Sequence, residues 1–298
     1  MATFVKARVV IFSDCDRFFF WWNRFFSRKI SDWGRFLFRK RTVPNQKKRK
    51  EITKMKKILI ISAMADVELN YLIENLQGKQ IIESKLCKFY IGKIYENEII
   101  LCDSKVGLIN NAAATTLAIE KFNPDYIINQ GCAGAISRNI HKSDIVIGTD
   151  CINITSINTK FKEEGKGYNL DDWELINFVA GEKDRLIPQN GSRELIEKIK
   201  KIENKYQYGK IHYGRIGSGD IWNSECDWLI KMNEKYGILC EEMEGIAIYT
   251  VANQYGIPAI DIRVISDNEI LKEEYDRNVS IRAQEFTMNL LKEIKEMF

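Results

Sequence analysis

Short apolar runs recur along the chain from residue 57 onward, each bounded by polar residues or glycine. The runs are six or seven residues long and rich in Ile and Val, and such β-branched residues pack well on a pleated sheet. This pattern is typical of buried strands. Six strands are predicted, at residues 57–62, 98–103, 125–130, 144–149, 211–217 and 259–265.

Segments with helical spacing of apolar residues separate these strands. Asn123-Pro124 closes one segment and Gly256-Ile257-Pro258 closes another, because proline cannot continue a helix. The alternation predicts a single three-layer α/β domain, with a mostly parallel central sheet flanked by helices. The predicted helices cover residues 67–76, 109–122, 192–202, 225–236, 245–255 and 283–298.

Residues 1–54 depart from this pattern. They hold 15 Lys+Arg against 4 Asp+Glu, and 9 of the 15 Phe, whereas residues 55–298 hold 30 Lys+Arg against 37 Asp+Glu. The basic pI therefore belongs to this leader. No periodic core is visible in it, so we expect a disordered or loosely helical basic segment outside the fold, with the domain spanning residues 55–298 from Met55.

The leader leaves alternatives open. FFFWWNRFF, residues 18–26, is too short to cross a bilayer as a helix, which needs roughly 20 apolar residues. Flanking Arg and Lys could instead hold it at a membrane interface, and an organelle-targeting peptide is a weaker alternative. A nucleic-acid contact would need a recognisable binding module, which the sequence does not show. The disordered interpretation is favoured.

Cysteine and histidine usage narrows the chemistry. The seven Cys are scattered and odd in number with no CxxC pair, which suits reduced thiols in a cytoplasmic protein. The two histidines are His141, in a predicted loop, and His212, in a predicted strand. A Ser-His-Asp triad or a His-rich zinc site therefore has little to build on, and carboxylates remain as the candidate catalytic groups.

Polar residues and glycines gather where the predicted strands end. Ligands of α/β folds collect beyond the carboxyl ends of strands, and glycines there let the backbone approach a ligand. A glycine-rich cluster on its own is usually an ordinary turn, but polar clusters at four strand ends predict a site. The clusters are Met64, Asp66 and Glu68; residues 130–134; residues 217–220; and Ser266 with Asp267.

The stretch CEEMEG, residues 240–245, places three carboxylates at the start of a predicted helix. Glutamates there could simply complement the helix dipole. However, Glu242 and Glu244 share a side if the segment is extended, and the IRVISD strand would bring Asp267 to the same rim. Paired acids at one cavity indicate chemistry on a sugar or a base.

MKKILIISAM, INQGCAG, GSGD, EEMEG and IRVISD, in this order, resemble the methylthioadenosine/S-adenosylhomocysteine nucleosidases of the nucleoside phosphorylase superfamily. The resemblance covers Met55 to Phe298, and its strongest part is the 23-residue interval from Glu244 to Asp267. It implies a nucleoside phosphorylase-like fold, a homodimer, no metal or other cofactor, and hydrolysis of the N-glycosidic bond of an adenine nucleoside.

The resemblance also implies roles for individual residues. Asp267 matches the general acid that protonates adenine at N7, and Ser266 and Arg263 match its supports. Glu244 matches the glutamate that binds the ribose hydroxyls, and Met243 the methionine packed against the sugar. For the remaining positions, Trp222 and Asn223 match the base-binding segment, Met64 lines the site, Cys132 stands where the family usually has Ser, and Glu241 and Glu242 are expected mainly to cap the helix or line the entrance.

The catalytic base is where the sequence departs from the family. The expected glutamate position, counted from Ala63, holds Val67, and Glu68 follows one residue later. A one-residue slip in the turn would restore the base, so Glu68 is predicted in that role, with Asp66 as the alternative. Residues 103–107 resemble the family only loosely, and residues 151–178 lack its usual substrate-loop pattern, which leaves the 5′ substituent of the substrate open.

Two other functions stay in view. Phosphorolysis would need a cationic phosphate cradle, commonly an Arg after the first strand, and SAMADVE offers acids there instead, which favours water. A non-catalytic nucleoside-binding protein, with Val67 as the sign of lost activity, is the alternative from another class. The sequence does not rank methylthioadenosine, adenosylhomocysteine, deoxyadenosine or a futalosine-like compound as the substrate.

Overall fold

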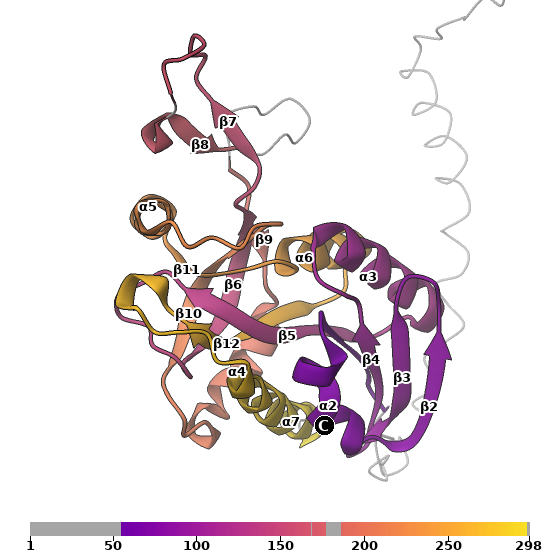
Figure 1. Ribbon diagram of the computed structural model, residues 1–298. Helices are drawn as coiled ribbons and strands as arrows, with labels where there is room; N and C mark the ends of the chain where they lie inside the picture. The colour runs from indigo at the N-terminus through magenta and orange to yellow at the C-terminus, as the bar shows by residue number, and fades with distance from the viewer. Residues whose placement is uncertain (1–54, 168, 177–185, 297–298) are drawn as a thin grey trace, which may run out of the picture. The chain divides into compact units, whose positions relative to one another are not determined.

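A computed structural model of the chain describes residues 55–167, 169–176 and 186–296 (Figure 1). The predictions made for the leader, residues 1–54, fall outside this part of the chain. Among the described helices, none combines the length and the apolar character that a bilayer crossing requires.

A mixed, mostly parallel sheet forms the centre of the domain, as predicted. Its strands follow the order β11-β10-β6-β12-β5-β1-β4-β3-β2, with β9 beside β6. Because β11 also pairs with β5, the strands from β5 to β11 close into a ring. The strands are β1 Lys57–Ser62, β2 Gln77–Glu83, β3 Lys88–Ile94, β4 Asn97–Asp103, β5 Tyr126–Ala135, β6 Ile145–Asn153, β9 Gln189–Asn190, β10 Ile211–Ser218, β11 Ile238–Glu242 and β12 Ala259–Asp267.

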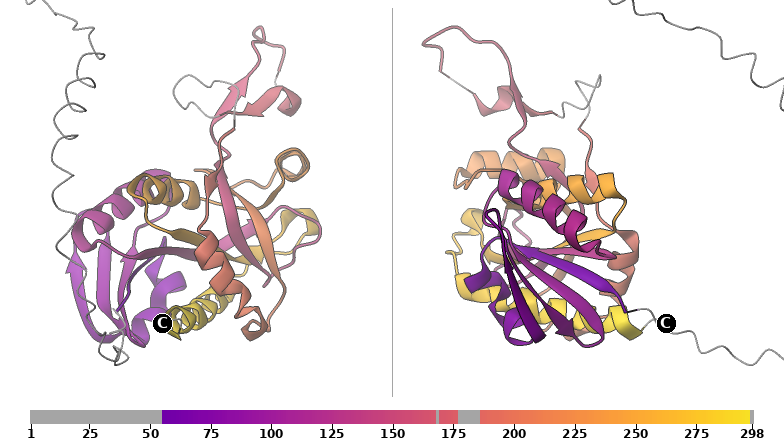
Figure 2. Two further views of the ribbon diagram at one scale, coloured as in Figure 1. Left: turned by 180° about the vertical axis from the view of Figure 1, so that it is seen from behind. Right: turned by 90° about the vertical axis from the view of Figure 1, so that its right-hand side faces the viewer.

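Helices cover both faces of this sheet (Figures 1 and 2). Helices α3 and α6 lie over one face, and α2, α4 and α7 lie over the other. The three-layer architecture predicted from the alternation of strands and helices is confirmed. The helices are α2 Asn70–Glu74, α3 Leu108–Phe122, α4 Arg193–Lys200, α5 Cys226–Tyr236, α6 Gly245–Tyr255 and α7 Ser280–Glu296.

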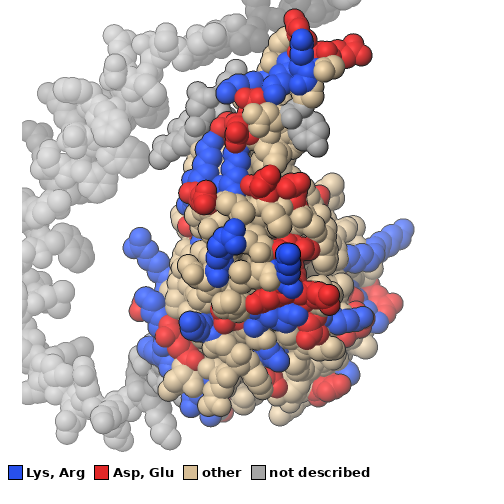
Figure 3. Space-filling view, turned by 60° about the vertical axis from the view of Figure 1, so that its left-hand side comes forward, with Lys and Arg blue, Asp and Glu red and all other residues tan. Residues whose placement is uncertain are grey.

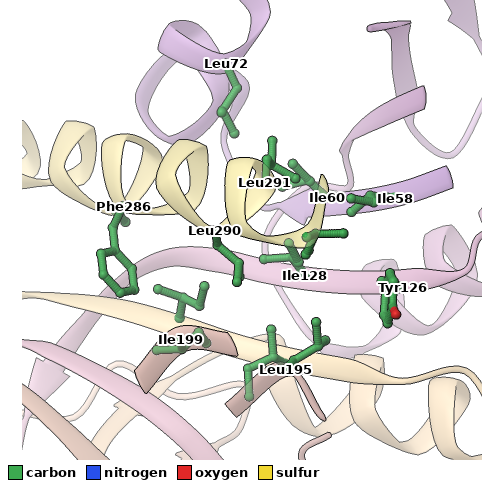
Figure 4. Packing of buried hydrophobic residues seen from close by; sticks show 14 of the residues in the cluster. Ile58, Ile60, Leu72, Tyr126, Ile128, Leu195, Ile199, Phe286, Leu290 and Leu291 are labelled. Atoms are coloured by element: carbon green, nitrogen blue, oxygen red, sulfur yellow. The ribbon is translucent and has the colours of Figure 1, made fainter. Parts of the chain in front are cut away.

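Side chains on the two faces of the central strands pack into two separate hydrophobic cores. In β1, Ile58 and Ile60 pack toward α7, while Leu59 and Ile61 pack toward α3 and α6. Both faces are apolar, so the strand reads as a continuous hydrophobic run in the sequence. Figure 4 shows Leu290 and Leu291 of α7 close to Ile128 on β5 and to the β1 residues.

Helix ends follow the predicted stop signals. α3 ends at Asn123, which has a φ of 47°, and α6 ends at Gly256, which has a φ of 68°. Both residues adopt the left-handed conformation that favours glycine or asparagine after a helix. These caps return the chain to the sheet at β5 and β12.

Several regions differ from the predicted pattern, among them β9 and β11, which were not predicted as strands. Residues 67–76 form a π-helical turn, η1 Ala65–Leu69, followed by the short α2, instead of one helix. The strands β2 and β3 extend the sheet, and a hairpin of β7 Ile157–Thr159 and β8 Trp173–Leu175 projects from the body (Figure 1). β2 is mostly exposed, so it lacks the apolar run that marks a buried strand.

Charged side chains are mixed over the face drawn in Figure 3, with Lys and Arg interspersed among Asp and Glu. A nucleic-acid backbone is usually followed by a continuous basic stripe. The described surface drawn there does not form such a stripe.

Candidate active site

One pocket gathers the polar clusters that follow β1, β5, β10, β11 and β12. This is the arrangement expected for strand ends that meet at one edge of an α/β sheet. Arg263 is the one predicted site residue that lies beneath the pocket lining. The predicted residues in the lining are Met64, Glu68, Cys132, Trp222, Asn223, Glu242, Met243, Glu244, Ser266 and Asp267.

The π-helical turn η1 carries Glu68 into this pocket. A π turn contains one residue more per hydrogen bond than an α turn, so it can absorb a one-residue insertion. The Glu68 carboxyl is buried and accepts hydrogen bonds from the backbone N–H groups of Ala63 (3.1 Å), Met64 (3.3 Å) and Cys132 (3.0 Å). The turn thus places the Glu68 carboxyl in the pocket lining.

Gly131 explains part of the QGCAG motif. A Cβ at this position would lie 2.5 Å from Glu68 Oε1 and 3.0 Å from Arg263 Nη1, so a side chain would collide with both. Burial raises the pKa of Glu68, while the Arg263 charge and the three backbone N–H groups oppose that rise. Glu68 is therefore a fixed, buried carboxyl beside a guanidinium.

Asp66, the alternative base, lies elsewhere. Its side chain is 81% exposed and pairs with Arg277 on the surface, at 3.3 Å. Val67, between the two acids, is buried, and its carbonyl accepts a hydrogen bond from Ser280 Oγ at 2.7 Å. The turn therefore directs Glu68 inward and Asp66 outward.

Arg263 holds three carboxyls at once from beneath the pocket. Its Nε donates to Asp261 at 2.7 Å, its Nη2 donates to Glu242 at 2.6 Å, and its Nη1 donates to Glu244 at 3.3 Å. The guanidinium is almost fully buried. Asp261 has no role in the sequence prediction, although its position two residues before Arg263 on one strand places both side chains on the same face.

Glu242 and Glu244 make different contacts at the start of α6. Glu242 is buried and accepts from the backbone N–H groups of Glu244 (2.8 Å) and Gly245 (2.8 Å), which caps the helix. Glu244 Oε1 accepts from the Gly107 N–H at 3.2 Å and stays in the lining. Burial raises the pKa of Glu244, Arg263 lowers it, and the charge of Glu242 raises it further.

Cys132 supports the site through its backbone. Its N–H donates to Glu68, and its carbonyl accepts from Arg263 Nη1 at 3.2 Å. These bonds do not depend on whether the side chain is Ser or Cys. The departure at this position therefore leaves the backbone scaffold of Glu68 and Arg263 in place.

Asp267 lies at the end of β12, where the strand register shifts between Ile265 and Asp267 opposite Gly134. Such a bulge re-aims side chains near active sites. Asp267 is buried, and its Oδ1 accepts a hydrogen bond from Ser266 Oγ at 2.6 Å. Burial raises its pKa most strongly, and the Ser266 hydrogen bond opposes the rise. Gly134 leaves room for Oδ2, which would lie 3.0 Å from a Cβ there.

Aromatic side chains stand at the mouth of the pocket. Trp222 is 68% exposed, and its ring lies 5.6 Å from that of Tyr275, at an interplanar angle of 68°. Tyr275, Val106 and Ile221 line the pocket but were missed by the sequence prediction. They lie on irregular loops, where no periodicity marks a residue as part of a site.

The histidines lie outside the pocket lining. His141 Nδ1 is 2.8 Å from Glu273, and His212 Nε2 is 2.9 Å from Asp144. In the described part of the chain, no group of three or more His, Cys, Asp and Glu side chains is placed to hold a metal ion.

Comparisons with known proteins agree with this geometry. A sequence model described as "Phosphorylase superfamily" matches residues 57–296. A 5′-methylthioadenosine/S-adenosylhomocysteine nucleosidase of Staphylococcus haemolyticus is 32% identical over 214 residues, which are 70% of this chain and 85% of that protein. A protein of the same name from Bacillus thuringiensis is 25% identical over 80% of this chain and its own full length.

Solved structures share the fold. The S-adenosylhomocysteine nucleosidase of Streptococcus pyogenes, in complex with 5-methylthiotubericidin, matches with a TM-score of 0.65 and 24% identity, over 81% of this chain and 98% of its own. The futalosine hydrolase of Helicobacter pylori matches with a TM-score of 0.68 and 21% identity, over 80% and 98%. Together with the sequence matches, these findings show that the chain belongs to the phosphorylase superfamily and, within it, to the 5′-methylthioadenosine/S-adenosylhomocysteine nucleosidase family.

Proposed function

We propose that this protein hydrolyses the N-glycosidic bond of an adenine nucleoside of the 5′-methylthioadenosine or S-adenosylhomocysteine type, releasing adenine and a ribose derivative. The observation that carries this proposal is the pairing, in one pocket, of a buried acid, Asp267, with the buried carboxyls Glu68 and Glu244 beside Arg263. The names of its relatives point to the same reaction.

The chemistry follows from the charge that develops as the bond breaks. Cleavage leaves positive charge on the ribose and negative charge on the base, so the site must supply electron density on one side and a proton on the other. A free Asp, with a pKa of about 3.9, is roughly 0.1% protonated at pH 7. Burial raises the pKa of Asp267, which favours the protonated form that can donate to adenine N7.

Glu68 and Glu244 serve the sugar side in this proposal. Glu244 binds the ribose hydroxyls, and Glu68 accepts a proton from the attacking water. Burial makes Glu68 a stronger base than a free glutamate, while its three backbone hydrogen bonds fix its orientation. Met243 and Met64 provide apolar contacts, and Trp222 provides a stacking surface for the base.

Water fits this pocket better than phosphate as the nucleophile. Among the described residues of the lining, none is Lys, Arg or His. Five carboxyls line it, and Arg263 beneath them is already bound to three acids. A phosphate dianion would meet this negative potential without a cation to receive it. The carboxyls in the lining are Glu68, Glu241, Glu242, Glu244 and Asp267.

We also propose a cytoplasmic homodimer whose domain spans residues 55–298. The six described cysteines are free thiols, which suits a reducing compartment. Ile109 is 81% exposed and Val106 is 41% exposed at the start of α3, beside the pocket. Exposed apolar side chains there suit a subunit contact. Light scattering on the wild type and on Ile109→Lys tests this, because the substitution should yield monomers.

Free adenine is the product that tests the reaction. The protein is mixed with methylthioadenosine, with and without phosphate, and the products are identified by mass spectrometry. We expect adenine and methylthioribose in both mixtures. A sugar 1-phosphate formed only with phosphate would establish phosphorolysis, and tight binding of the nucleoside without turnover would establish a binding protein.

A further inference from the structure

Glu241 is a pocket carboxyl that the proposed mechanism does not use. It lies on β11, where its cross-strand partner on β5 is Gly134. Asp267 on β12 is paired with the same Gly134 from the other side. Residues in register across neighbouring strands project toward the same face, and the glycine between them has no side chain. Glu241 and Asp267 therefore flank one open position at the same level of the pocket.

One oxygen of Glu241 lacks a partner. Its Oε2 is buried and makes no hydrogen bond to any residue in the described part of the chain. The backbone N–H of Asn223 lies close enough to the carboxyl to lower its pKa. A buried, unpaired polar atom costs about 1–3 kcal/mol, and a ligand group that pairs with it removes this cost.

The surroundings of Glu241 favour its neutral form. Burial raises its pKa to about 8, the charge of Glu269 adds to the rise, and Asp267 adds to it when ionised, while the Asn223 N–H opposes it. The titratable groups that act on it come from β12 and from η4 Glu269–Leu271, and the Asn223 N–H comes from the loop after β10. When the carboxyl is neutral, one of its oxygens donates a hydrogen bond and the other accepts one.

We propose that Glu241 is a specificity-determining residue that reads the six-membered ring of the purine, with Oε2 donating to N1 and Oε1 accepting from the 6-amino group. This inference rests on the proposed function, in which Asp267 faces N7. The 6-amino group lies between N7 and N1 on the purine, so a second acid at the level of Asp267 meets the N1 edge. A 6-oxopurine presents the opposite pattern there, with a donor at N1 and an acceptor at position 6.

Ionisation of Glu241 reverses this preference. The carboxylate has only acceptors, so it repels the N1 lone pair of adenine and accepts from the N1–H of hypoxanthine. Selectivity for 6-amino over 6-oxo purines should therefore fall as the pH rises through about 8. A glutamine at this position keeps one donor and one acceptor at every pH, which makes Glu241→Gln the matched control.

Calorimetric binding of adenine and of hypoxanthine at pH 6.5 and pH 8.5 tests the inference without requiring turnover. For the wild type, we expect the ratio of the two dissociation constants to shift toward hypoxanthine by about tenfold or more between these pH values. In Glu241→Gln, this ratio should change only as far as adenine and hypoxanthine themselves titrate in solution. That contribution is the same for both proteins. Glu241→Leu should bind adenine more weakly and discriminate least at both pH values.

The outcomes separate this inference from the proposed function. Equal shifts in the wild type and Glu241→Gln, with adenine still bound, would overturn the role of Glu241 alone. Failure of the wild type to bind adenine at either pH would overturn both.

Discussion

The two ends of the pocket use carboxyl groups in different electrostatic surroundings. At the sugar end, Glu68, Glu242 and Glu244 surround Arg263, whose guanidinium opposes the effect of burial on Glu68 and Glu244. At the base end, Asp267 receives a hydroxyl from Ser266 but no guanidinium. The carboxyls at the sugar end are thus in direct contact with a buried guanidinium, whereas at the base end the Ser266 hydroxyl and the charge of Lys142 oppose the effect of burial on Asp267.

This difference agrees with the roles proposed for the two ends. A compensated carboxylate can remain an acceptor, which suits hydroxyl binding and deprotonation of water. An uncompensated one lowers its free energy by holding a proton, which suits an acid. However, the single positive charge of Arg263 cannot balance several carboxylates. The neighbouring carboxylates therefore still raise the pKa of Glu244 and of Asp261. The protonation of each carboxyl at the sugar end therefore depends on the charges of the others.

The largest effect should come from breaking the base end. Asp267→Asn keeps the size of the side chain but removes its acidic proton, so we expect adenine release to slow by about 10³- to 10⁴-fold. Rates are measured with methylthioadenosine under saturation. Glu269→Gln is the control, because it removes a nearby acid outside the pocket lining and should stay within about threefold of the wild type. Near-normal turnover of Asp267→Asn would remove Asp267 from the mechanism.

At the sugar end, Arg263→Met tests the compensation directly. The substitution leaves Asp261, Glu242 and Glu244 buried without their shared cation, which should cost about 3–5 kcal/mol in the free energy of unfolding. Urea denaturation measures this. Arg215→Met is the control, since Arg215 pairs with the single Asp150 at a partly exposed site and should cost about 1 kcal/mol or less. Equal losses in the two variants would contradict a special role for Arg263.

Glu68→Gln removes the base while keeping an acceptor for some of the backbone N–H groups. We expect a loss of about 10²- to 10³-fold in turnover. Asp66→Asn, two residues earlier on the exposed side of the same turn, should leave the rate unchanged. The pair separates the two candidate bases. A large loss in Asp66→Asn with normal turnover in Glu68→Gln would reverse the assignment.

The central fold was predictable because its strands are buried on both faces. Runs such as residues 58–61 are apolar at every position, and the stop signals at Asn123 and Gly256 end the helices where predicted. The edge strand β2 and its neighbour β3 were missed because both are partly exposed to water, so their residues lack the continuous apolar pattern. The apolar pattern of the sequence therefore predicts the buried strands well and the strands near the sheet edge poorly.

Individual residues of the candidate site were predictable from the sequence, but the contacts that connect them were not. Glu244 and Asp267 were recognisable because they sit in motifs at strand ends. The π turn that brings Glu68 inward depends on tertiary contacts, such as the backbone bond to Cys132, which no local count reveals. Asp261 was hidden within an apolar strand, although a charged pair two residues apart on a buried strand is itself a signal of a buried network.

The smallest expected effect concerns the stability of the base end. Burial raises the pKa of Glu241 to about 8 from an ordinary value of 4.5, so the folded chain binds a proton that the unfolded chain releases between these pH values. The stability contributed by that proton is complete below about pH 4.5 and is lost as the pH rises through about 8. Glu241→Gln has no such loss.

Thermal melts of the wild type and Glu241→Gln at pH 5, 7 and 9 measure this contribution. The two proteins should differ least at pH 5, and the melting temperature of the variant should rise relative to that of the wild type as the pH increases to 9. A constant difference across the series would mean that Glu241 does not titrate in the folded state. Glu241 would then have its charge balanced by a further group, as the carboxyls at the sugar end do. The contrast between the two ends would rest on Asp267 alone.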